Sequence, residues 1–315
     1  MNALYLINYM VFAAFITTFV IELGFALLIL TDYKKYGQKA AGYIKPIWEA
    51  NATFGVFYLV NTELTYPLLL TTAAALYITP LLLAAALIII KNAFLAYGEY
   101  IGDKKSAEKS FYIYAACMVA IAILIFSVLG SAFTGHGVSL SHATASIWAF
   151  VNTFNALIII SAVIIALAIA SAVVEDEEML FGFKGGILVL LVFLIDIAGI
   201  YLYSADVGRS MGQHIIPLAA SLALLLAYAG AVMARSRRAK YVLVAWLFIS
   251  VLLLGFVEYP YIFGMQNVGA YVGTGAIAGP AILISTIGGT LVAIAIAYLL
   301  YMSYVSKAIP RAGSS

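Results

Sequence analysis

The sequence contains little charge and almost no cysteine. Only 10% of its 315 residues are charged and 65% are hydrophobic, whereas soluble globular proteins have roughly a quarter charged and half apolar. So few polar side chains could not cover the core of a soluble protein of this length. The one cysteine, Cys117, excludes an intrachain disulfide and a thiolate cluster for zinc or iron–sulfur binding. The composition therefore predicts a chain whose outer surface faces a lipid bilayer.

Nine apolar stretches are bounded by charged residues, Gly or Pro. Each is at least as long as the roughly 20 residues that a helix needs to cross a bilayer. They are 4–31, 46–66, 68–96, 111–133, 143–173, 180–203, 214–234, 241–263 and 282–305. Pro67 alone separates the second from the third, which predicts a tight hairpin. We therefore expect an all-α polytopic membrane protein of about nine transmembrane helices, with residues 1–315 forming a single integral membrane domain.

Basic residues are distributed unevenly between the two sets of loops. In a nine-span chain, fourteen of the sixteen Lys and Arg fall on one side, Arg209 falls on the other, and Lys91 lies within a span. The fourteen are Lys34, Lys35, Lys39, Lys45, Lys104, Lys105, Lys109, Lys184, Arg235, Arg237, Arg238, Lys240, Lys307 and Arg311. Cytoplasmic loops carry the excess of positive charge, so we expect the N-terminus outside and the C-terminus in the cytoplasm. The sequence pI of about 8.4 reflects these loops and gives no reason to expect a nucleic-acid partner.

Six ionisable residues lie inside the expected spans. A charge near mid-membrane costs at least about 2.5 kcal/mol unless it is paired or hydrated, and such residues commonly line ion, proton or substrate paths. Glu22, Glu49 and Lys91 lie toward the cytoplasmic side, and Glu63, Asp196 and Glu258 toward the outside. Structural ion pairs and side chains that reach the interface are the alternatives. For Lys91, about five residues from its expected helix end, we expect the side chain to reach the interface.

Glu49 has the most distinctive surroundings of the six. It lies one turn into the second span, next to Trp48, which can anchor at the lipid headgroups, and Asn51 follows two residues later. At 100° per residue, Thr53 and Glu63 return near the helix face of Glu49, and the residues between them on that face are apolar. This pattern predicts a short polar half-channel from the cytoplasm to Glu49, but no complete proton path along this helix.

The three histidines, His136, His142 and His214, fall in outer loops or at outer helix ends. Imidazole is a common metal ligand. However, no two of these histidines lie four residues apart in a helix, and no cysteine accompanies them. The spacing favours ordinary loop residues, so we expect no metal site on this chain.

The run Trp48-Glu49-Ala50-Asn51 resembles the Trp-Asp-Gly-Asn motif near the start of the second helix in subunit II of cytochrome bd-type quinol oxidases. The similarity continues without a gap to Pro67, where the family also has an aromatic-Pro step. Three shorter matches are Glu22 with Gly24-Phe25, Asn152-Thr153-Phe154, and Glu258-Tyr259-Pro260. The resemblance therefore covers nearly the whole chain, through short motifs.

The chain departs from these family motifs at several positions. Glu49 replaces Asp, Ala50 replaces Gly, and Phe54 stands where the family has a second Trp. Leu27 stands where an Asp often follows Gly-Phe, and Thr153 replaces Pro. A Glu can relay a proton as well as an Asp, so the first replacement preserves the chemistry. The sequence is thus similar to a divergent member of the family.

The resemblance implies a fold of two four-helix bundles plus one peripheral helix. It also implies that this chain is the haem-free subunit of a quinol:oxygen oxidoreductase in a prokaryotic plasma membrane, with no catalytic residue and no directly bound cofactor of its own. The haem-bearing subunit I would complete the heterodimer and hold the quinol site and haem b, with haem d left open. A small accessory subunit and a structural quinone or lipid are compatible with the family.

The same resemblance implies a proton path from the cytoplasm. By position, Glu49 corresponds to the family's carboxylate at the mouth of one such path. Trp48, Asn51, Thr53 and Glu22 are the residues that we expect beside it. The charges of the loops independently assign Glu49 to the cytoplasmic side.

Two other classes of protein remain open. Glu22, Glu49 and Glu63 could couple ions in a secondary transporter, although transporter helices often break near the midplane and Pro67 lies at the expected surface. A quinol-binding membrane anchor of another respiratory reductase would also be apolar and polytopic.

Overall fold

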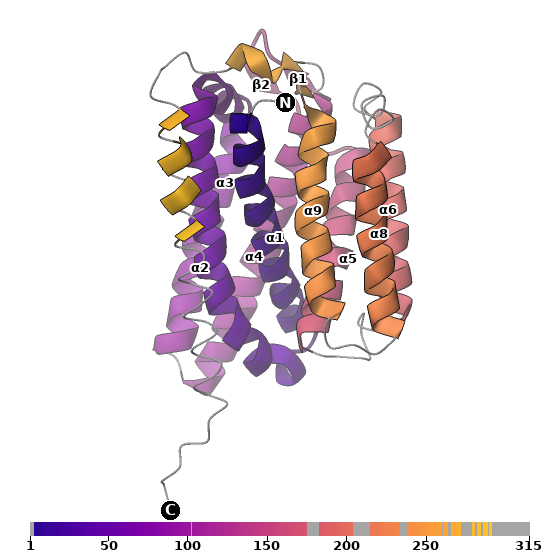
Figure 1. Ribbon diagram of the computed structural model, residues 1–315. Coiled ribbons are helices and arrows are strands. Elements are labelled where there is room, and N and C mark those ends of the chain that lie inside the picture. The colour runs from indigo at the N-terminus through magenta and orange to yellow at the C-terminus, as the bar shows by residue number, and fades with distance from the viewer. Residues whose placement is uncertain are drawn as a thin grey trace, which may run out of the picture.

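The computed structural model describes most of the chain. The described residues are 3–101, 103–174, 183–203, 215–233, 239–259, 261–263 and 266–271, and, between 279 and 291, all except 281, 285 and 289. They contain eight long α-helices that run up and down past one another (Figure 1). These are α1 (Ala3–Thr31), α2 (Tyr33–Thr65), α3 (Pro67–Tyr100), α4 (Lys104–Thr134), α5 (Thr153–Val174), α6 (Phe183–Tyr203), α8 (Ile215–Met233) and α9 (Ala239–Glu258).

The eight helices form two groups of four. Helices α1 to α4 pack together, and α5, α6, α8 and α9 pack together beside them. Helix α1 touches both groups, because it also packs against α5 and α9. The arrangement corresponds to the two four-helix bundles that the resemblance implies. The expected ninth span, 282–305, lies mostly outside the described residues, although Thr286 Oγ1 near its start accepts a hydrogen bond from Asn61 Nδ2 of α2 at 3.4 Å.

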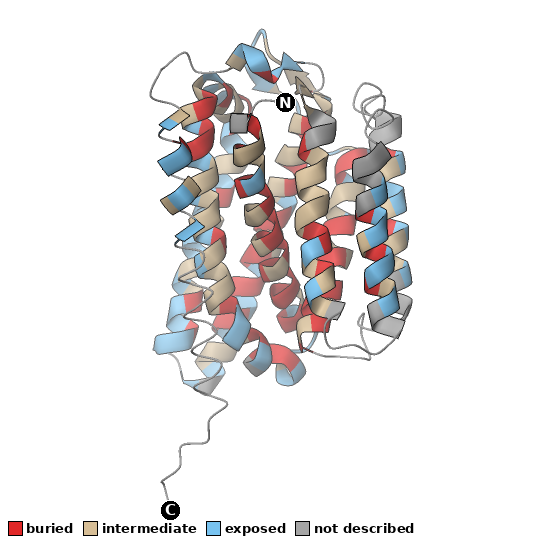
Figure 2. Ribbon diagram, in the orientation of Figure 1, coloured by how far each residue is buried: buried red, intermediate tan, exposed pale blue. Residues whose placement is uncertain are grey.

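Helix α1 occupies the centre of the molecule. Figure 2 shows buried residues concentrated on the central helices, while exposed residues lie mainly on the outer ones. Leu23, Phe25, Leu28 and Ile29 are fully buried. Gly24 permits a close approach to α5, because a Cβ atom at this position would overlap the Ala166 carbonyl oxygen. The two bundles therefore share one continuous hydrophobic core.

Four of the described helices are long and apolar enough to cross a membrane: α1, α3, α4 and α5. Helices α6, α8 and α9 contain shorter apolar segments. Large side chains on the outer surface, such as Ile89 and Leu82, are more than half exposed, as expected where a surface faces lipid. The described residues thus form a multi-pass, all-α membrane protein.

The second helix is longer than the expected span 46–66. It begins at Tyr33, where Asp32 caps it by accepting a hydrogen bond from the Lys35 amide at 3.1 Å. The expected span began at Pro46, which lies inside the helix. The hydropathy pattern detected only the apolar part of α2 and missed the polar turns before it. At the other end, Tyr66 is the only residue between α2 and α3, which confirms the tight hairpin predicted at Pro67.

The fifth helix is shorter than the expected span 143–173. Residues before it form a small hairpin of β1 (Val138–Ser139) and β2 (Thr144–Ala145), followed by the 3₁₀ turn η1 (Ile147–Ala149). Helix α5 begins only at Thr153, because Asn152 Oδ1 accepts a hydrogen bond from the Asn155 amide at 2.9 Å. Asn is among the residues that cap helix starts best. The apolar side chains of this segment cover the end of the bundle instead of extending the helix.

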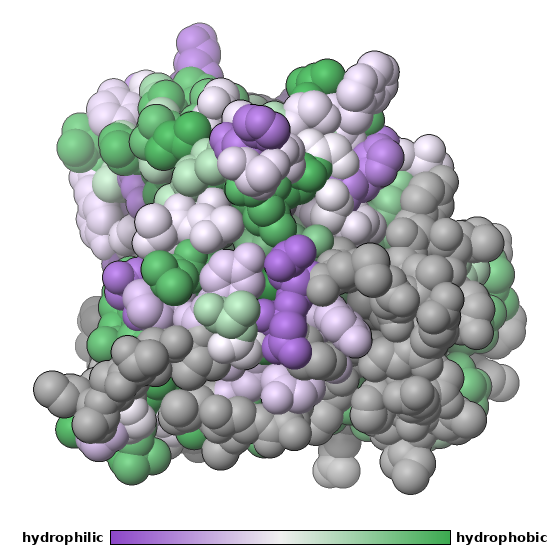
Figure 3. Space-filling model, turned by 90° about the horizontal axis from the view of Figure 1, so that it is seen from above, coloured by the Kyte–Doolittle hydropathy of each residue, from purple (hydrophilic) through white to green (hydrophobic). Residues whose placement is uncertain are grey.

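A second hairpin follows α9 at the same end. It contains β3 (Tyr261–Ile262) and β4 (Gln266–Asn267), and the 3₁₀ turn η2 (Val268–Tyr271) comes next. The helix of the expected span 241–263 already ends at Glu258. Beyond it, the Phe263 amide donates to the Ala132 carbonyl of α4 at 2.7 Å. Seen from above, the described part of this end mixes hydrophilic and hydrophobic side chains (Figure 3), which is typical of a membrane boundary.

The loops rich in lysine gather at the opposite end. Lys45 Nζ of α2 lies 3.4 Å from Glu99 Oε1 and also donates to the Tyr100 hydroxyl, so the N-terminal part of α2 lies next to the end of α3. Asp103 caps α4 at this end by accepting from the Ser106 amide at 2.8 Å. Hydrogen bonds from the side chain and the backbone amide of Ser106 lower the pKa of Asp103. The structure therefore brings the basic first turns of α2 and of α4 to one end, as the expected topology requires.

Candidate functional site

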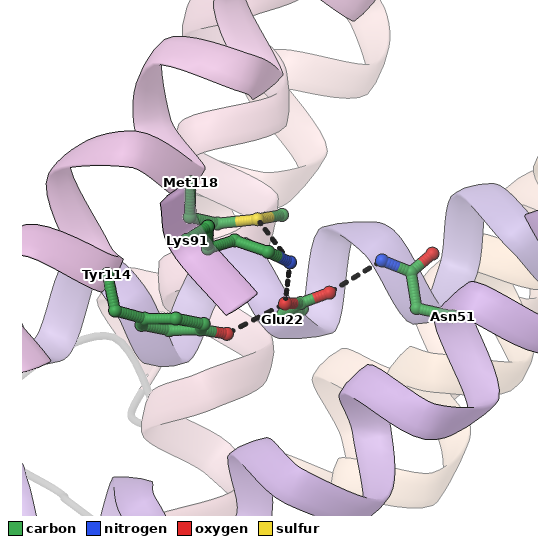
Figure 4. Close-up of polar contacts among 5 residues, drawn as sticks. All are labelled: Glu22, Asn51, Lys91, Tyr114 and Met118. Atoms are coloured by element: carbon green, nitrogen blue, oxygen red, sulfur yellow. Dashed lines mark hydrogen bonds and ion pairs between the residues drawn. The ribbon is translucent and has the colours of Figure 1, made fainter. Parts of the chain in front are cut away.

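A buried polar cluster lies at the centre of the N-terminal bundle. Helix α1 contributes Glu22, α2 contributes Asn51, α3 contributes Lys91, and α4 contributes Tyr114 and Met118 (Figure 4). Each of the four helices therefore carries at least one member. The side chains point inward toward the Glu22 carboxylate, around which the cluster is organised.

Both oxygens of the Glu22 carboxylate accept hydrogen bonds. Oε1 accepts from Lys91 Nζ at 2.5 Å and from the Tyr114 hydroxyl at 2.7 Å. Oε2 accepts from Asn51 Nδ2 at 2.5 Å. Lys91 Nζ also lies 3.9 Å from Met118 Sδ and 5.5 Å from the centre of the Tyr114 ring. Hydrogen bonds to a charged group are stronger than neutral ones, so the carboxylate binds the four helices together.

The cluster is almost completely removed from solvent. Glu22 and Tyr114 are 0% exposed, Lys91 is 4% exposed and Asn51 is 7% exposed. Burying an unpaired charge in this position would cost a large free energy. Here the Glu22 carboxylate and the Lys91 ammonium group neutralise each other, and hydrogen bonds satisfy the carboxylate oxygens. Breaking such a buried pair from one side typically costs about 3–5 kcal/mol. The cluster is therefore a strong structural constraint on the bundle.

Lys91 corrects one sequence-based expectation. We expected its ammonium group to reach the interface, but the side chain is buried and paired with Glu22. Helix α3 continues to Tyr100, so Lys91 lies nine residues from its end and the interface is too far away. Opposite charges at similar membrane depth usually pair with each other, and this signal was available in the sequence.

Asn51 joins the cluster through its amide nitrogen. The Glu22 carboxylate can only accept in this contact, so the Asn51 NH₂ group must face it. The amide oxygen, Oδ1, is buried without a hydrogen-bond partner among the described residues. Asn51 therefore belongs to the inner face of α2, and the acid that it contacts is Glu22 of α1.

Glu49 lies on the other face of α2. Two residues correspond to about 200° around a helix, so Glu49 points away from Asn51, and its side chain is exposed. In the described part of the chain its carboxylate makes no hydrogen bond or ion pair. Thr53 Oγ1 donates to the Glu49 backbone carbonyl at 2.8 Å, and Trp48 packs half-buried against the main core. The structure thus separates Glu49 from Glu22.

The three acidic residues expected toward the outside have different surroundings. Glu63 is exposed near the end of α2. Asp196 of α6 is half-buried and accepts a hydrogen bond from the Ser161 hydroxyl of α5 at 2.6 Å. Glu258 is the last residue of α9, and its side chain lies outside the described residues. These acids do not form one cluster with Glu22.

A cavity of about 350 Å³ lies between the two bundles, toward the end that carries the N-terminus. Its walls are mainly apolar and aromatic, and they come from α1, α4, α5, α6 and α9. Asp196 and Ser161 line it together, and Ser221 of α8 pairs with Ser250 of α9 at 2.7 Å. The Trp246 indole nitrogen is buried with no acceptor among the described groups. The cavity could hold an apolar molecule that accepts a hydrogen bond.

The cavity offers few of the usual haem ligands. Haem iron in proteins is usually held by His, Met, Cys or Tyr, and the described lining includes tyrosines, such as Tyr5 and Tyr66, but no His, Met or Cys. His136 and His142 lie in the outer hairpin, where His142 Nδ1 pairs with Ser139 and Ser141 at 3.1 Å each; His214 lies outside the described residues. No group of three metal-binding side chains occurs within the described ranges.

Fold and composition together define a multi-pass α-helical membrane protein built from two four-helix bundles. Its fold is similar to that of a chain in the structure of bd oxidase from Geobacillus thermodenitrificans. The TM-score is 0.77 at 16% sequence identity, covering 96% of this chain and 99% of that chain. No protein-family model and no curated protein match the sequence. The resemblance stated from the motifs is therefore confirmed at the level of the fold.

Proposed function

We propose that the chain is the haem-free subunit of a bd-type quinol oxidase. The likeness of fold over nearly the full length of both chains carries this proposal, and the motif at Trp48-Glu49-Ala50-Asn51 agrees with it. The proposal includes nine spans, with the N-terminus outside and the C-terminus in the cytoplasm of a prokaryotic cell. The haem-bearing subunit would pack beside this chain and supply haem b, with haem d left open, and the quinol site.

The surroundings of the cavity suit an apolar guest. Of the usual haem ligands, its described walls offer only Tyr. Its apolar walls and the Trp246 indole instead suit a structural quinone or lipid, whose polar end would accept the indole hydrogen. Electron transfer and oxygen reduction would then take place in the partner. This chain would contribute packing and a route for protons.

Glu49 would receive the proton from the cytoplasm. Its carboxylate is exposed on α2, so it is open to water or to a partner surface, and it lies on the side that the loop charges assign to the cytoplasm. The helix around Glu49 is fixed by its two neighbours. Trp48 packs against the main core, and Thr53 donates a hydrogen bond to the Glu49 carbonyl. Beyond Glu49 the path would continue through the haem-bearing subunit, because the next residues on that face of α2, Val56 and Val60, are apolar.

Glu22 and Asn51 would have a positioning role on this path. Both oxygens of Glu22 are engaged by Lys91, Tyr114 and Asn51, so the carboxylate has little capacity to exchange a proton with Glu49. By binding Asn51, it fixes the rotation of α2 about its axis. That rotation determines where the Glu49 carboxylate points.

Purification from native membranes tests the assignment. We expect a haem-bearing subunit to co-purify, and a reduced-minus-oxidised spectrum to show haem in the complex but not in this chain after dissociation. A stable homo-oligomer without haem would contradict the proposal and favour a transporter.

A pair of variants tests the proton path in the purified complex. Glu49→Gln should slow quinol-driven oxygen consumption at least tenfold, because general acid–base groups contribute about 10²–10⁴ in rate. Assembly and haem content should stay unchanged. Glu63→Gln is the matched control, since Glu63 is an exposed acid at the other end of the same helix. Equal turnover in the two variants would remove Glu49 from the path.

A further inference from the structure

A groove of about 1040 Å³ opens on the surface at the lysine-rich end. Its walls come from four helices: α1, the part of α2 from Lys39 to Phe54, the end of α5 and the start of α9. It is distinct from the cavity next to Asp196 and from the Glu22 cluster, neither of which shares a lining residue with it. The lining residues are Ala14, Thr17, Thr18, Lys39, Tyr43, Phe54, Val173, Val174, Lys240, Tyr241, Val244, Ala245 and Phe248.

The two long walls of the groove present the same order of side chains. On α9, Lys240, Val244 and Phe248 follow one another at intervals of four residues, so they lie on one helix face. On α2, Lys39 and Tyr43 are also four residues apart and share a face. Phe54 returns to that face eleven residues, or about 16 Å, further along the helix. Each wall therefore runs from a lysine at the end of the bundle to a phenylalanine deeper inside it.

The rim of the groove combines positive charge with aromatic rings. Lys39 is exposed, and Lys240 Nζ lies 5.7 Å from the centre of the Tyr241 ring. Tyr43 is 39% exposed and Tyr241 is 69% exposed. Lysine and tyrosine at the ends of membrane helices lie at the level of lipid headgroups. An anion placed between Lys39 and Lys240 would thus be held at that level.

The floor of the groove is suited to an apolar chain. Thr17 and Thr18 are the polar residues of α1 there, and their hydroxyls donate to the Ala13 and Ala14 carbonyls of the same helix at 2.7 and 2.9 Å. Because these donors are satisfied internally, no further polar partner is required. Val173 and Ala245 complete the apolar surface.

We propose that this groove binds one anionic phospholipid of the cytoplasmic leaflet. The phosphate would lie between Lys39 and Lys240, and an acyl chain would run past Val244 toward Phe54 and Phe248. Basic pockets between transmembrane helices on the cytoplasmic side are known to recognise anionic headgroups. The inference does not depend on the proposed oxidase activity, and takes from the proposed function only the orientation that puts the lysine-rich end in the cytoplasm.

The bound lipid would join the two bundles at their cytoplasmic ends. Helices α1 and α2 belong to one bundle, and α5 and α9 belong to the other, so the occupant touches both. A ligand that binds only the folded state raises its stability. Added anionic phospholipid should therefore raise the thermal unfolding temperature of the delipidated protein.

The test uses the full chain in its native complex, delipidated in neutral detergent. Thermal unfolding and native mass spectrometry are recorded with phosphatidylglycerol, phosphatidylcholine or inorganic phosphate. We expect phosphatidylglycerol to raise the unfolding temperature and to remain bound as one copy at this site, while the other two have no effect. An equal effect of inorganic phosphate would show a simple anion site and overturn the lipid proposal.

Two variants locate the site. The double variant Lys39→Gln/Lys240→Gln should weaken phosphatidylglycerol binding roughly 25-fold, since each lysine near an anionic surface contributes about fivefold. Ala245→Trp should weaken it by filling the groove while leaving the charges intact. The control Lys34→Gln/Lys105→Gln removes two exposed lysines of the same end that do not line the groove. Binding that is equal in the first variant and the control overturns the proposal.

The acidic run Glu175-Asp176-Glu177-Glu178 could pair with Lys39 and Lys240 in place of a lipid phosphate. It directly follows Val174, which lines the groove, and it lies outside the described residues. If the lysines served this run, the Lys39→Gln/Lys240→Gln variant would lower the unfolding temperature equally with and without phosphatidylglycerol. That result would also overturn the proposal, whereas a difference that appears only with the lipid supports it.

Discussion

The two polar regions of the membrane interior are organised in opposite ways. In the N-terminal bundle, Glu22 and Lys91 are fully packed, and each oxygen of the carboxylate is bonded. Between the bundles, Asp196 faces a cavity of about 350 Å³ with a single hydrogen bond, from Ser161. In the first region a buried carboxylate is paired with a buried ammonium group. In the second region a single half-buried acid lines a cavity.

This contrast separates structural from ligand-binding uses of polar residues in one membrane protein. A compensated ion pair at the crossing of four helices resists any movement of those helices, because separation of the charges is very costly in a medium of low dielectric constant. A cavity with few polar groups tolerates change and can accept a guest. We therefore expect stability to depend on the first region, while ligands act on the second.

The largest effect should come from Lys91→Met. This change leaves the Glu22 carboxylate buried without its cation, and it should lower the free energy of unfolding by about 3–5 kcal/mol. Denaturant unfolding in detergent, followed by circular dichroism, measures the loss. Lys45→Met is the control, since it removes an exposed pair with Glu99 and should cost less than about 1 kcal/mol.

The pair itself can be tested with a double variant. Glu22→Gln/Lys91→Met removes both charges, so it should recover more than half of the stability that Lys91→Met loses. If the double variant is as unstable as the single one, the hydrogen bonds of Tyr114 and Asn51, rather than charge compensation, hold the bundle.

A smaller effect should come from Gly24→Val, at the seam between the regions. The added side chain would overlap the Ala166 carbonyl and the Ala170 methyl group of α5, and such overpacking typically costs about 1–3 kcal/mol. The same unfolding measurement applies. Gly42→Ala is the control: a Cβ atom there meets nothing within 4 Å, and replacing a helical glycine should add about 0.5–1 kcal/mol. Equal stability of the two variants would show that α1 and α5 can separate without cost.

The smallest effect should come from Asp196→Asn. The amide oxygen of Asn can still accept the hydrogen bond from Ser161, so the free energy of unfolding should change by less than about 1 kcal/mol. A loss as large as that of Lys91→Met would contradict the contrast, because it would mean that the cavity region also depends on a buried charge.

Much of the architecture was predictable because it follows from hydropathy and loop charge. Apolar length located eight helices, and Pro67 marked the turn between α2 and α3. The ends were less accurate. The capping side chains of Asp32 and Asn152 act through one hydrogen bond each, which a hydropathy pattern does not detect. Asn152 was noted for its resemblance to a family motif, but its position as a helix cap was not predicted.

The site was predicted only in part, for a geometric reason. The sequence drew attention to Glu49 and Asn51 together, but they lie on opposite faces of α2. The contact of Glu22 with Lys91 joins residues 69 positions apart, and no local pattern encodes such a distance. Their opposite charges and similar depth were the available signals. The role of Glu49 in proton uptake stays a prediction.

The separation of Glu22 and Lys91 along the chain has a consequence for biogenesis. The ribosome makes α1 first, and Lys91 follows 69 residues later. At about 5–20 residues per second, Glu22 waits roughly 3–14 seconds for its cation, and during this time an isolated carboxylate in lipid costs at least about 2.5 kcal/mol. The first helix should therefore stay beside the insertion machinery until the third arrives, so that the N-terminal bundle enters the bilayer as a group.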